Sequence, residues 1–232
     1  MQGIVLCGGY GLRMGHLTQT TPKPLLKLGE HTLLDYILKN ISRSKVSKVY
    51  LAVDYLREKI VDHVREVENE YDFDIDFLYG KSGEDTAGAI LGAKDFLKDD
   101  FFVTVGDDLT NLDFSDFYKM HKESKAIASI AAIRENKKYD FGVLDVKGDY
   151  VTGFEEKPVT AFTTNIGSYF FKPQIFDHIE FGDDFAQDVF PRLLRKNLKI
   201  YCYTGNFFWY SIGTIKKYDY YKDNLHLIEK YF

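Results

Sequence analysis

The stretch VLCGGYGLRMGHLTQTTPKPLLKLGE, residues 5–30, decides the fold of this chain. It continues a short apolar segment, Gly3–Leu6, and runs directly into a loop that contains Gly8, Gly9 and Gly11. A short apolar run that ends in glycines is typical of a buried strand. In parallel sheets, ligands bind beyond the carboxyl ends of the strands. The loop is therefore placed to be the binding site of an α/β domain.

The chemistry of this glycine loop favours a phosphate group. Glycines permit positive φ and bring bare backbone N–H groups close to an anion, and Arg13 adds a planar, permanently charged fork. A dinucleotide fingerprint is excluded because Met14 stands at the position of its third glycine, and a P-loop is excluded because no Gly-Lys-Ser/Thr follows. The alternative is a tight turn with a solvated arginine, which the second cation nearby, Lys23, disfavours.

Lys23 stands between two of the five prolines of the chain, Pro22 and Pro24. Proline fixes its own φ and pushes the preceding residue toward extended geometry. The pattern predicts a lysine on a stiff, extended backbone that aims it in one direction. A preorganised charge of this kind needs little reorganisation during a reaction. The alternative is that the prolines only end a strand or a helix.

The rest of the chain alternates apolar segments with amphipathic ones, which predicts a three-layer α/β domain with a mostly parallel mixed sheet. Three later segments with short connections predict added antiparallel strands: Phe141–Val146, Val151–Glu155 and Ile166–Phe171. We expect one compact domain over residues 1–232, without a C-terminal left-handed β-helix. The other strands are expected at Lys48–Val53, Ile75–Tyr79, Phe101–Val105, Ile127–Ile133 and Lys199–Tyr203, and helices at Thr32–Ile41, Leu56–Val67, Thr86–Leu97, Phe114–Lys122, Asp184–Leu194 and Ile215–Ile228.

Composition excludes several classes of function. The net charge of −5 gives no support for binding nucleic acid. No apolar run approaches the roughly 18 residues that span a bilayer, so we expect no membrane association. Two cysteines are too few for a disulfide framework and favour the cytoplasm. Whether the chain forms a homo-oligomer stays open.

The segment LCGGYGLRMGHLTQTTPKPLLKLGEHTLLDYIL resembles the signature of the sugar-1-phosphate nucleotidyltransferases, and is closest in motif to mannose-1-phosphate guanylyltransferases. That signature runs G-G-x-G-T/S-R and then P-K-P-L-L. The resemblance implies a Rossmann-like nucleotidyltransferase domain in which Arg13 and Lys23 are catalytic cations. Leu12 departs from the usual Thr/Ser, so one hydroxyl contact to phosphate is missing. The nucleotide contacts implied in this loop are Leu6, Gly8, Gly9 and Gly11.

GEDTAGAI, residues 83–90, resembles the base-recognition turn of the family in its guanylyltransferase form. Thymidylyl members often carry glutamine at the position of Gly88. Glycine there leaves room for a larger base, and Glu84 can accept hydrogen bonds from the N1–H and amino groups of guanine. The alternative is an ordinary helix N-terminus capped by Asp85 or Thr86.

Two later motifs bear on a metal. FFVTVGDDL places Asp107 and Asp108 at the end of a strand, where carboxylates suit Mg²⁺. The resemblance assigns the Mg²⁺ ligand to Asp107, while alternation along the strand turns Asp108 elsewhere. In FFWYSIGTIKKY, Ser211 occupies the position of the family's second metal-binding aspartate. Either Asp108 or a substrate phosphate completes the coordination, or catalysis is lost and binding is kept. The intact cationic positions favour activity.

The sugar phosphate is assigned by resemblance to two motifs. YDFGVLDVKGDYVTGFEEKP is similar to the family's Y-G-V … F-x-E-K-P strands, which implies close approach of a sugar at Gly142, hydroxyl contacts at Glu156 and a phosphate contact at Lys157. NIGSYFF is similar to the strand whose asparagine contacts the sugar, here Asn165.

The implied reaction joins a nucleoside triphosphate to a sugar 1-phosphate and releases pyrophosphate. GTP with mannose 1-phosphate or a related sugar is the first expectation. The alternatives are dTTP or UTP with glucose 1-phosphate, and a catalytically silent regulatory subunit that binds a nucleotide sugar.

Overall fold

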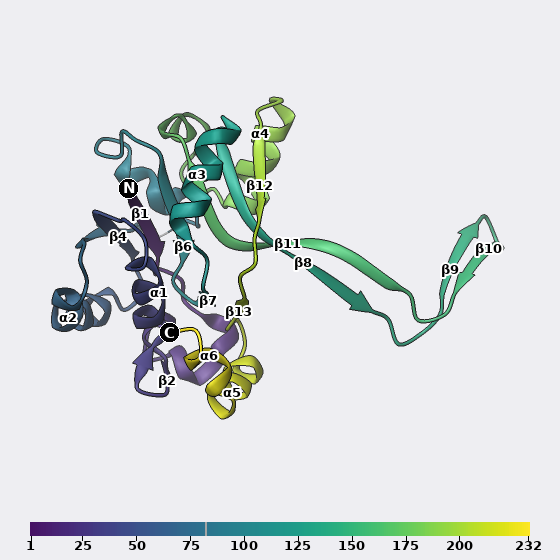
Figure 1. The fold of residues 1–232 in the computed structure, drawn as a ribbon, viewed down its shortest axis with the longest axis horizontal. Coiled ribbons are helices and arrows are strands. Elements are labelled where there is room, and N and C mark those ends of the chain that lie inside the picture. The colour runs from purple at the N-terminus through teal and green to yellow at the C-terminus, as the bar shows by residue number, and fades with distance from the viewer. Residues whose placement is uncertain (82) are drawn as a thin grey trace.

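The computed structural model describes residues 1–81 and 83–232, and its centre is a seven-stranded sheet (Figure 1). β11 is antiparallel to both of its neighbours, β6 and β8, and the other pairs are parallel. This arrangement confirms the mostly parallel mixed sheet. In spatial order the strands are β12 (Ile200–Thr204), β8 (Ala128–Lys138), β11 (Val159–Phe171), β6 (Phe101–Val105), β1 (Gln2–Leu6), β4 (Lys48–Val53) and β5 (Asp74–Tyr79).

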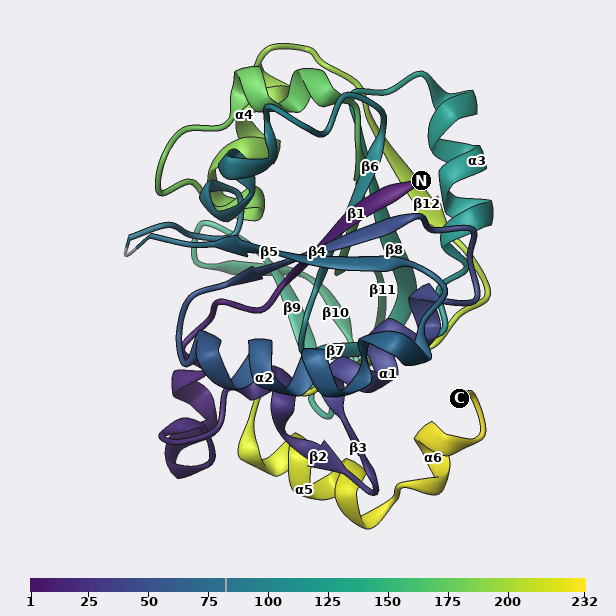
Figure 2. The same ribbon diagram turned by 90° about the vertical axis from the view of Figure 1, so that its left-hand side faces the viewer.

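Helices cover both faces of the sheet (Figure 2). Successive strand residues point to opposite faces, so Val5 of β1 joins one buried cluster and Ile4 joins the other. The first cluster lies under α1 (Leu33–Ile41), α2 (Arg57–Val67) and α3 (Phe114–Ser124), and also receives side chains of α5 (Ile215–Asp223) and α6 (His226–Glu229). The second lies under α4 (Phe190–Arg195) and several short helical turns, including Pro173–His178.

Three expected helices differ from those observed. The segment 86–97 forms only a short 3₁₀ helix, Gly88–Ala93, because glycines at 88 and 92 weaken an α-helix. The segment 184–194 begins as a π turn, Phe185–Val189, before α4, since Pro191 has no N–H to continue the same hydrogen-bond ladder. The closing helix is divided into α5 and α6, with a break at Asn224.

The largest difference concerns the antiparallel strands. β8 and β11 run on past the sheet as a two-stranded ribbon, and β9 (Val143–Lys147) and β10 (Tyr150–Glu155) form a separate hairpin at its end (Figure 1). We call residues 134–163 the arm. A register shift between Asn165 and Tyr169, with Gly167 at a φ of 74°, marks a bulge where the ribbon joins the sheet. The expected compact shape is therefore wrong for this part of the chain.

Two short pairs of strands complete the fold. β2 (Lys27–Leu28) pairs with β3 (His31–Thr32), and β7 (Asp108–Thr110) pairs with β13 (Trp209–Ser211). The second pair carries two candidate site residues. Across residues 1–81 and 83–232, no helix has the length and apolar character needed to cross a membrane.

The start of α1 is tied to α2 by a shared carboxylate. The Asp35 amide donates to the Thr32 hydroxyl (3.1 Å) and the Thr32 amide donates to Asp35 Oδ2 (2.7 Å), which is a capping box. Asp35 Oδ1 also lies 2.7 Å from His63 Nε2 of α2. That hydrogen bond raises the pKa of His63. Burial alone would raise the pKa of Asp35, but its hydrogen bonds with His63 and Thr32 outweigh burial and lower this pKa overall.

We expect Asp35→Ala to lower the free energy of unfolding by about 1–2 kcal/mol through loss of the cap. The loss should be larger near pH 5.5 than near pH 8.5. His63 has a raised folded-state pKa, so its contribution is complete below its unfolded-state pKa and disappears as the pH rises through the folded-state value. Urea unfolding at both pH values measures this. His63→Gln, which keeps the cap, should remove the pH dependence alone; an equal loss at both pH values in Asp35→Ala contradicts the assignment.

Candidate active site

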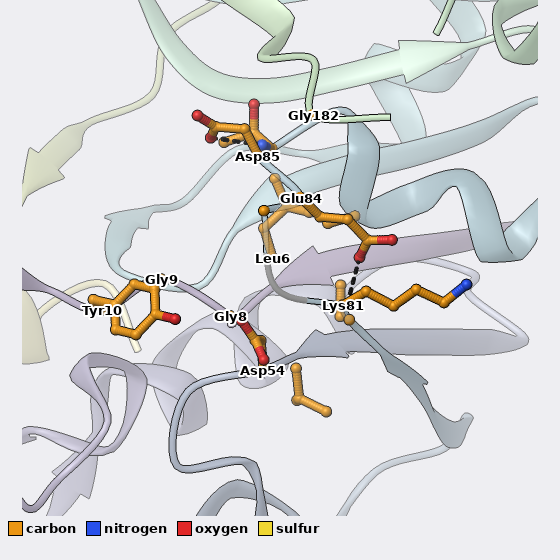
Figure 3. A pocket seen from close by; sticks show the side chains of 15 residues that line it. Leu6, Gly8, Gly9, Tyr10, Asp54, Lys81, Glu84, Asp85 and Gly182 are labelled. Atoms are coloured by element: carbon orange, nitrogen blue, oxygen red, sulfur yellow. Dashed lines mark hydrogen bonds between the residues drawn. The ribbon is translucent and has the colours of Figure 1, made fainter. Parts of the chain in front are cut away.

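A cleft lies at the carboxyl ends of β1, β4 and β6, where the sequence places the glycine loop. It consists of two adjoining hollows of about 420 and 630 Å³, both lined by Leu6, Gly9 and Tyr10 on one side and by Asp85 and Thr86 on the other. Volumes of this size suit small-molecule ligands. Figure 3 shows the first hollow, between the glycine loop, Asp54 of the β4 end and the loop at Glu84.

The glycine loop is shaped by close contacts. Gly8 passes so near Asp54 that a Cβ on it would lie 3.2 Å from the Asp54 Cβ. Gly11 has a φ of 62°, which favours glycine, and a Cβ there would lie 2.9 Å from Thr18 Cγ2. The Thr18 hydroxyl donates to the Gly11 carbonyl (3.0 Å) and closes the turn. The loop therefore presents bare backbone to the cleft.

The backbone at Lys23 is constrained as predicted, but it is helical where an extended conformation was expected. Pro22 is extended, with a ψ of 143°, whereas Lys23 begins a one-turn 3₁₀ helix, Lys23–Leu25, that is closed by a bond from the Leu25 amide to the Pro22 carbonyl (2.8 Å). Pro24 fits this turn because proline is tolerated near a helix start. The side chain of Lys23 is only 8% exposed and its Nζ forms an ion pair with Asp107 at the second hollow.

Arg13 lies at the opposite wall of the second hollow. The guanidinium lies close to Gly213, which follows β13: a Cβ on Gly213 would be in van der Waals contact with Arg13 Nη2, at 3.6 Å. Arg13 is exposed and takes part in none of the ion pairs among the described residues. It is available to an anion that enters the hollow.

The adjacent carboxylates of Asp107 and Asp108 have different surroundings. Asp107 lines the second hollow with a side chain that is 32% exposed. Asp108 lies under Trp209, whose Nε1 donates to Asp108 Oδ2 (2.9 Å), and it pairs in register with Ser211. Burial first, and then the neighbouring Asp107, raise the pKa of Asp108 to about 6.

Asp107 fits a Mg²⁺ ion, which takes one or two carboxylates together with phosphate oxygens and waters. Among the residues that the structure describes, no cluster of three or more His, Cys, Asp or Glu side chains could hold a metal. A metal at Asp107 would therefore need substrate oxygens for most of its coordination. Ser211 is beside Asp108 rather than in the lining of the hollow.

The loop at the first hollow is braced by its own polar groups. The Lys81 amide donates to Glu84 Oε2 (2.9 Å), as Figure 3 shows, and Glu84 lines the hollow. Gly88 does not line it: a Cβ there would lie 3.0 Å from the backbone nitrogen of Gly182. Glycine at position 88 lets these two backbones approach each other closely. The sequence instead suggested that Gly88 leaves room for a base.

The expected sugar-phosphate residues are not brought to this cleft. Asn165 lies at the base of the arm, where its Nδ2 donates to the Tyr169 hydroxyl (3.0 Å) and its Oδ1 accepts from the Gly167 amide (2.9 Å). Gly142, Glu156 and Lys157 lie near the arm hairpin, far along the ribbon in Figure 1. Gly142 and Glu156 lie close together, since a Cβ on Gly142 would lie 2.9 Å from Glu156 Oε2, and Lys157 is the next residue along the chain.

Sequence reasoning missed Asp54, Trp209 and Gly182. Asp54 could have been found, because it follows the strand Lys48–Val53 at the same edge as the glycine loop. Trp209 and Gly182 reach the site through contacts with residues about a hundred positions away, at Asp108 and Gly88, and no local pattern reveals such contacts.

Comparison with known proteins gives a consistent picture. The sequence model of the family described as nucleotidyl transferase matches residues 2–228. A mannose-1-phosphate guanyltransferase of Saccharomyces cerevisiae is 30% identical over 225 residues, which are 93% of this chain and 62% of the relative. A UTP–glucose-1-phosphate uridylyltransferase of Synechocystis is 29% identical, over 94% of this chain and 61% of the relative. The chain thus spans about three fifths of the length of these relatives.

A solved structure shares the fold. HddC from Yersinia pseudotuberculosis superposes with a TM-score of 0.76 at 22% identity, covering 97% of this chain and 99% of HddC. The same protein complexed with GMP-PN superposes with a TM-score of 0.74. At this identity the likeness concerns the α/β fold.

Proposed function

This chain belongs to the nucleotidyl transferase family, and we propose that it transfers a nucleoside monophosphate from a nucleoside triphosphate to a sugar 1-phosphate, with release of pyrophosphate. The first substrate pair is GTP with mannose 1-phosphate or a related sugar. The observation that carries the proposal is the meeting of Arg13, Lys23 and Asp107 around one hollow beside the bare glycine loop. The low cysteine count favours the cytoplasm as the location.

In this reaction an oxygen of the sugar phosphate attacks the α-phosphorus, and the bond from that phosphorus to the β-phosphate bridging oxygen breaks. The electron pair leaves with pyrophosphate. The nucleophile is already an anion at neutral pH, so no general base is needed. The obstacle is repulsion between two anions, and fixed cations lower it by positioning and neutralising charge. Arg13 is available to bind the triphosphate, and Lys23 is held in the lining of the same hollow by its ion pair with Asp107.

Asp107 is the residue that would hold Mg²⁺. When bound, the ion supplies charge neutralisation on the phosphate oxygens and orients them. The ion pair between Lys23 and Asp107 keeps both groups at the hollow before substrate arrives. Asp108 remains covered by Trp209 and supports the strand end.

A second substrate pair, UTP or dTTP with glucose 1-phosphate, is favoured by the Synechocystis relative, whose name states that activity. A silent binding subunit is the third candidate, and its support is Ser211 in place of an acidic residue. Glu84 at the first hollow favours guanine over uracil, because a carboxylate accepts from both the N1–H and the amino group of guanine.

Pyrophosphate release, measured across a panel of four nucleoside triphosphates and several sugar 1-phosphates with Mg²⁺, tests the proposal. We expect turnover with GTP and mannose 1-phosphate or a related sugar. Turnover only with UTP or dTTP and glucose 1-phosphate would select the second pair. No turnover with any pair, together with calorimetric binding of a nucleotide sugar, would select the silent subunit.

We expect Glu84→Gln to weaken GTP binding about tenfold, because a hydrogen bond to a charged acceptor contributes about 1.5–3 kcal/mol. UTP binding should change little. Calorimetric titration with each nucleotide measures the difference. Asp85→Asn is the matched control, since Asp85 also lines the hollow while its Oδ1 accepts from the Thr86 amide. Equal weakening of GTP and UTP by Glu84→Gln would instead indicate damage to the loop that Glu84 braces.

A further inference from the structure

We propose that two copies of this chain exchange their arms, so that Glu156 and Lys157 of one copy complete the cleft of the other. The catalytic part of this inference rests on the proposed function. The exchange itself rests on where the arm leaves the sheet, on its surface and on the chemistry it carries.

The arm leaves the sheet at the edge that holds the cleft. β8 and β6 are both antiparallel to β11, so they run in the same direction and their carboxyl ends meet at one edge. Beyond the sheet, Arg134–Lys138 pair with 159–163 in unbroken register, and all ten of these residues are exposed. At about 3.4 Å per residue, these five pairs extend the ribbon by about 17 Å.

The arm exposes far more apolar surface than a free ribbon in water would carry. Of the sixteen large apolar side chains that are exposed among the described residues, nine belong to residues 141–162. A hairpin of two strands is marginally stable alone, and large exposed apolar patches mark protein interfaces. The nine are Phe141, Val143, Leu144, Val146, Tyr150, Val151, Phe154, Val159 and Phe162.

A second copy is the partner that fits this surface. The rim of the cleft exposes Leu12 to 84% and Tyr10 to 54%, which gives the body an apolar surface beside the catalytic cations. The arm of the same chain extends away from the body of the fold in Figure 1. In a two-fold pair, an arm that contacts the rim of the other body makes that contact twice, once from each copy, because the symmetry duplicates every contact.

The residues near the hairpin suit the cleft they would enter. The cleft binds anions, and the arm brings a further cation, Lys157, with the carboxylate of Glu156 beside it. Lys157 has a φ of 50°, and such a backbone persists in a non-glycine residue only where its surroundings determine it. Gly142 makes room for Glu156. None of these three residues lines a hollow formed by the described residues of its own chain.

Sedimentation of the wild-type chain and of two arm variants tests the exchange. We expect a wild-type dimer and a monomer for Leu144→Asp with Phe154→Asp, an exposed pair that is in register across β9 and β10. Lys147→Asp, which alters charge in the same hairpin, is the control and should stay dimeric. A monomeric wild type, or a dimer that survives the double variant, overturns the exchange.

A heterodimer shows whether the arm acts on the other copy. One copy carries Lys23→Ala and the other Lys157→Ala, and two different tags allow the pair to be purified after coexpression. Under exchange, one of the two sites combines an intact cleft with an intact arm, so about half of the wild-type turnover returns while both homodimers stay impaired. Turnover no higher than the mean of the homodimers overturns the exchange. If the wild type turns over no substrate, the proposed function fails and sedimentation alone decides the exchange.

Discussion

Replacing Lys23 by alanine is expected to lower kcat about 100-fold, the cost of removing one preorganised charged contact from a reacting group. Lys23 is fixed by the turn between Pro22 and Pro24, and its ammonium reaches the hollow from a nearly buried position. We therefore expect its contact with the reacting phosphates to strengthen in the transition state without reorganisation of the lysine. We expect KM to change less than kcat, because Arg13 and the glycine loop, which line the same hollow and are the proposed triphosphate contacts, are left unchanged.

Pyrophosphate release under saturating substrates measures this loss. Lys27→Ala is the matched control, since Lys27 lies four residues away on β2 with an exposed side chain and lines neither hollow. Urea unfolding of both variants checks that the fold is retained. Undiminished kcat in Lys23→Ala would remove this lysine from the reaction and leave Arg13 as the cation of the site.

Much of the sheet could be predicted because its signal is local. Apolar runs such as Lys48–Val53 and Phe101–Val105 become central parallel strands, and the glycine loop lies at the carboxyl end of β1 as expected. Lys23 and Asp107 were also found from short motifs. Their pairing across 84 positions follows from the order of β1 and β6 in the sheet.

The direction of the arm could not be predicted, because periodicity identifies a strand but not what covers it. The extension of β8, Arg134–Lys138, is entirely polar, so no apolar alternation marks it as part of a strand. The bulge at Gly167, where the ribbon leaves the sheet, depends on strand register, which the sequence does not reveal. The position of Glu156 and Lys157 depends on that register. The family motif predicts that these side chains bind the sugar phosphate, whereas neither hollow of the described cleft is lined by them.

The role of Gly88 was missed for a related reason. Its neighbour, Gly182, lies in a loop about ninety residues later, and the contact exists only because that loop folds over the 3₁₀ helix Gly88–Ala93. From the sequence alone, Gly88 is explained by the space that a nucleotide base needs, because the motif implies a nucleotide ligand. In the structure, the reason for a glycine at position 88 is the close packing of its backbone against that of Gly182.

Asp107→Asn is the second substitution for which we expect a large loss, about 100-fold or more in kcat at fixed Mg²⁺. Asparagine keeps the size of the side chain but removes the negative charge that a hard cation requires. The Mg²⁺ concentration for half-maximal turnover should therefore rise.

The matched control for Asp107→Asn is Asp108→Asn, one residue along the chain. Asp108 is covered by Trp209, and an asparagine oxygen can still accept the bond from Trp209 Nε1, so its Mg²⁺ requirement should change little. A Mg²⁺ titration of pyrophosphate release on both variants separates the two carboxylates. If Asp108→Asn shifts the Mg²⁺ requirement and Asp107→Asn does not, the ion belongs with Asp108 and Ser211, and the half-buried carboxylate of Asp107 serves only to hold Lys23 in place.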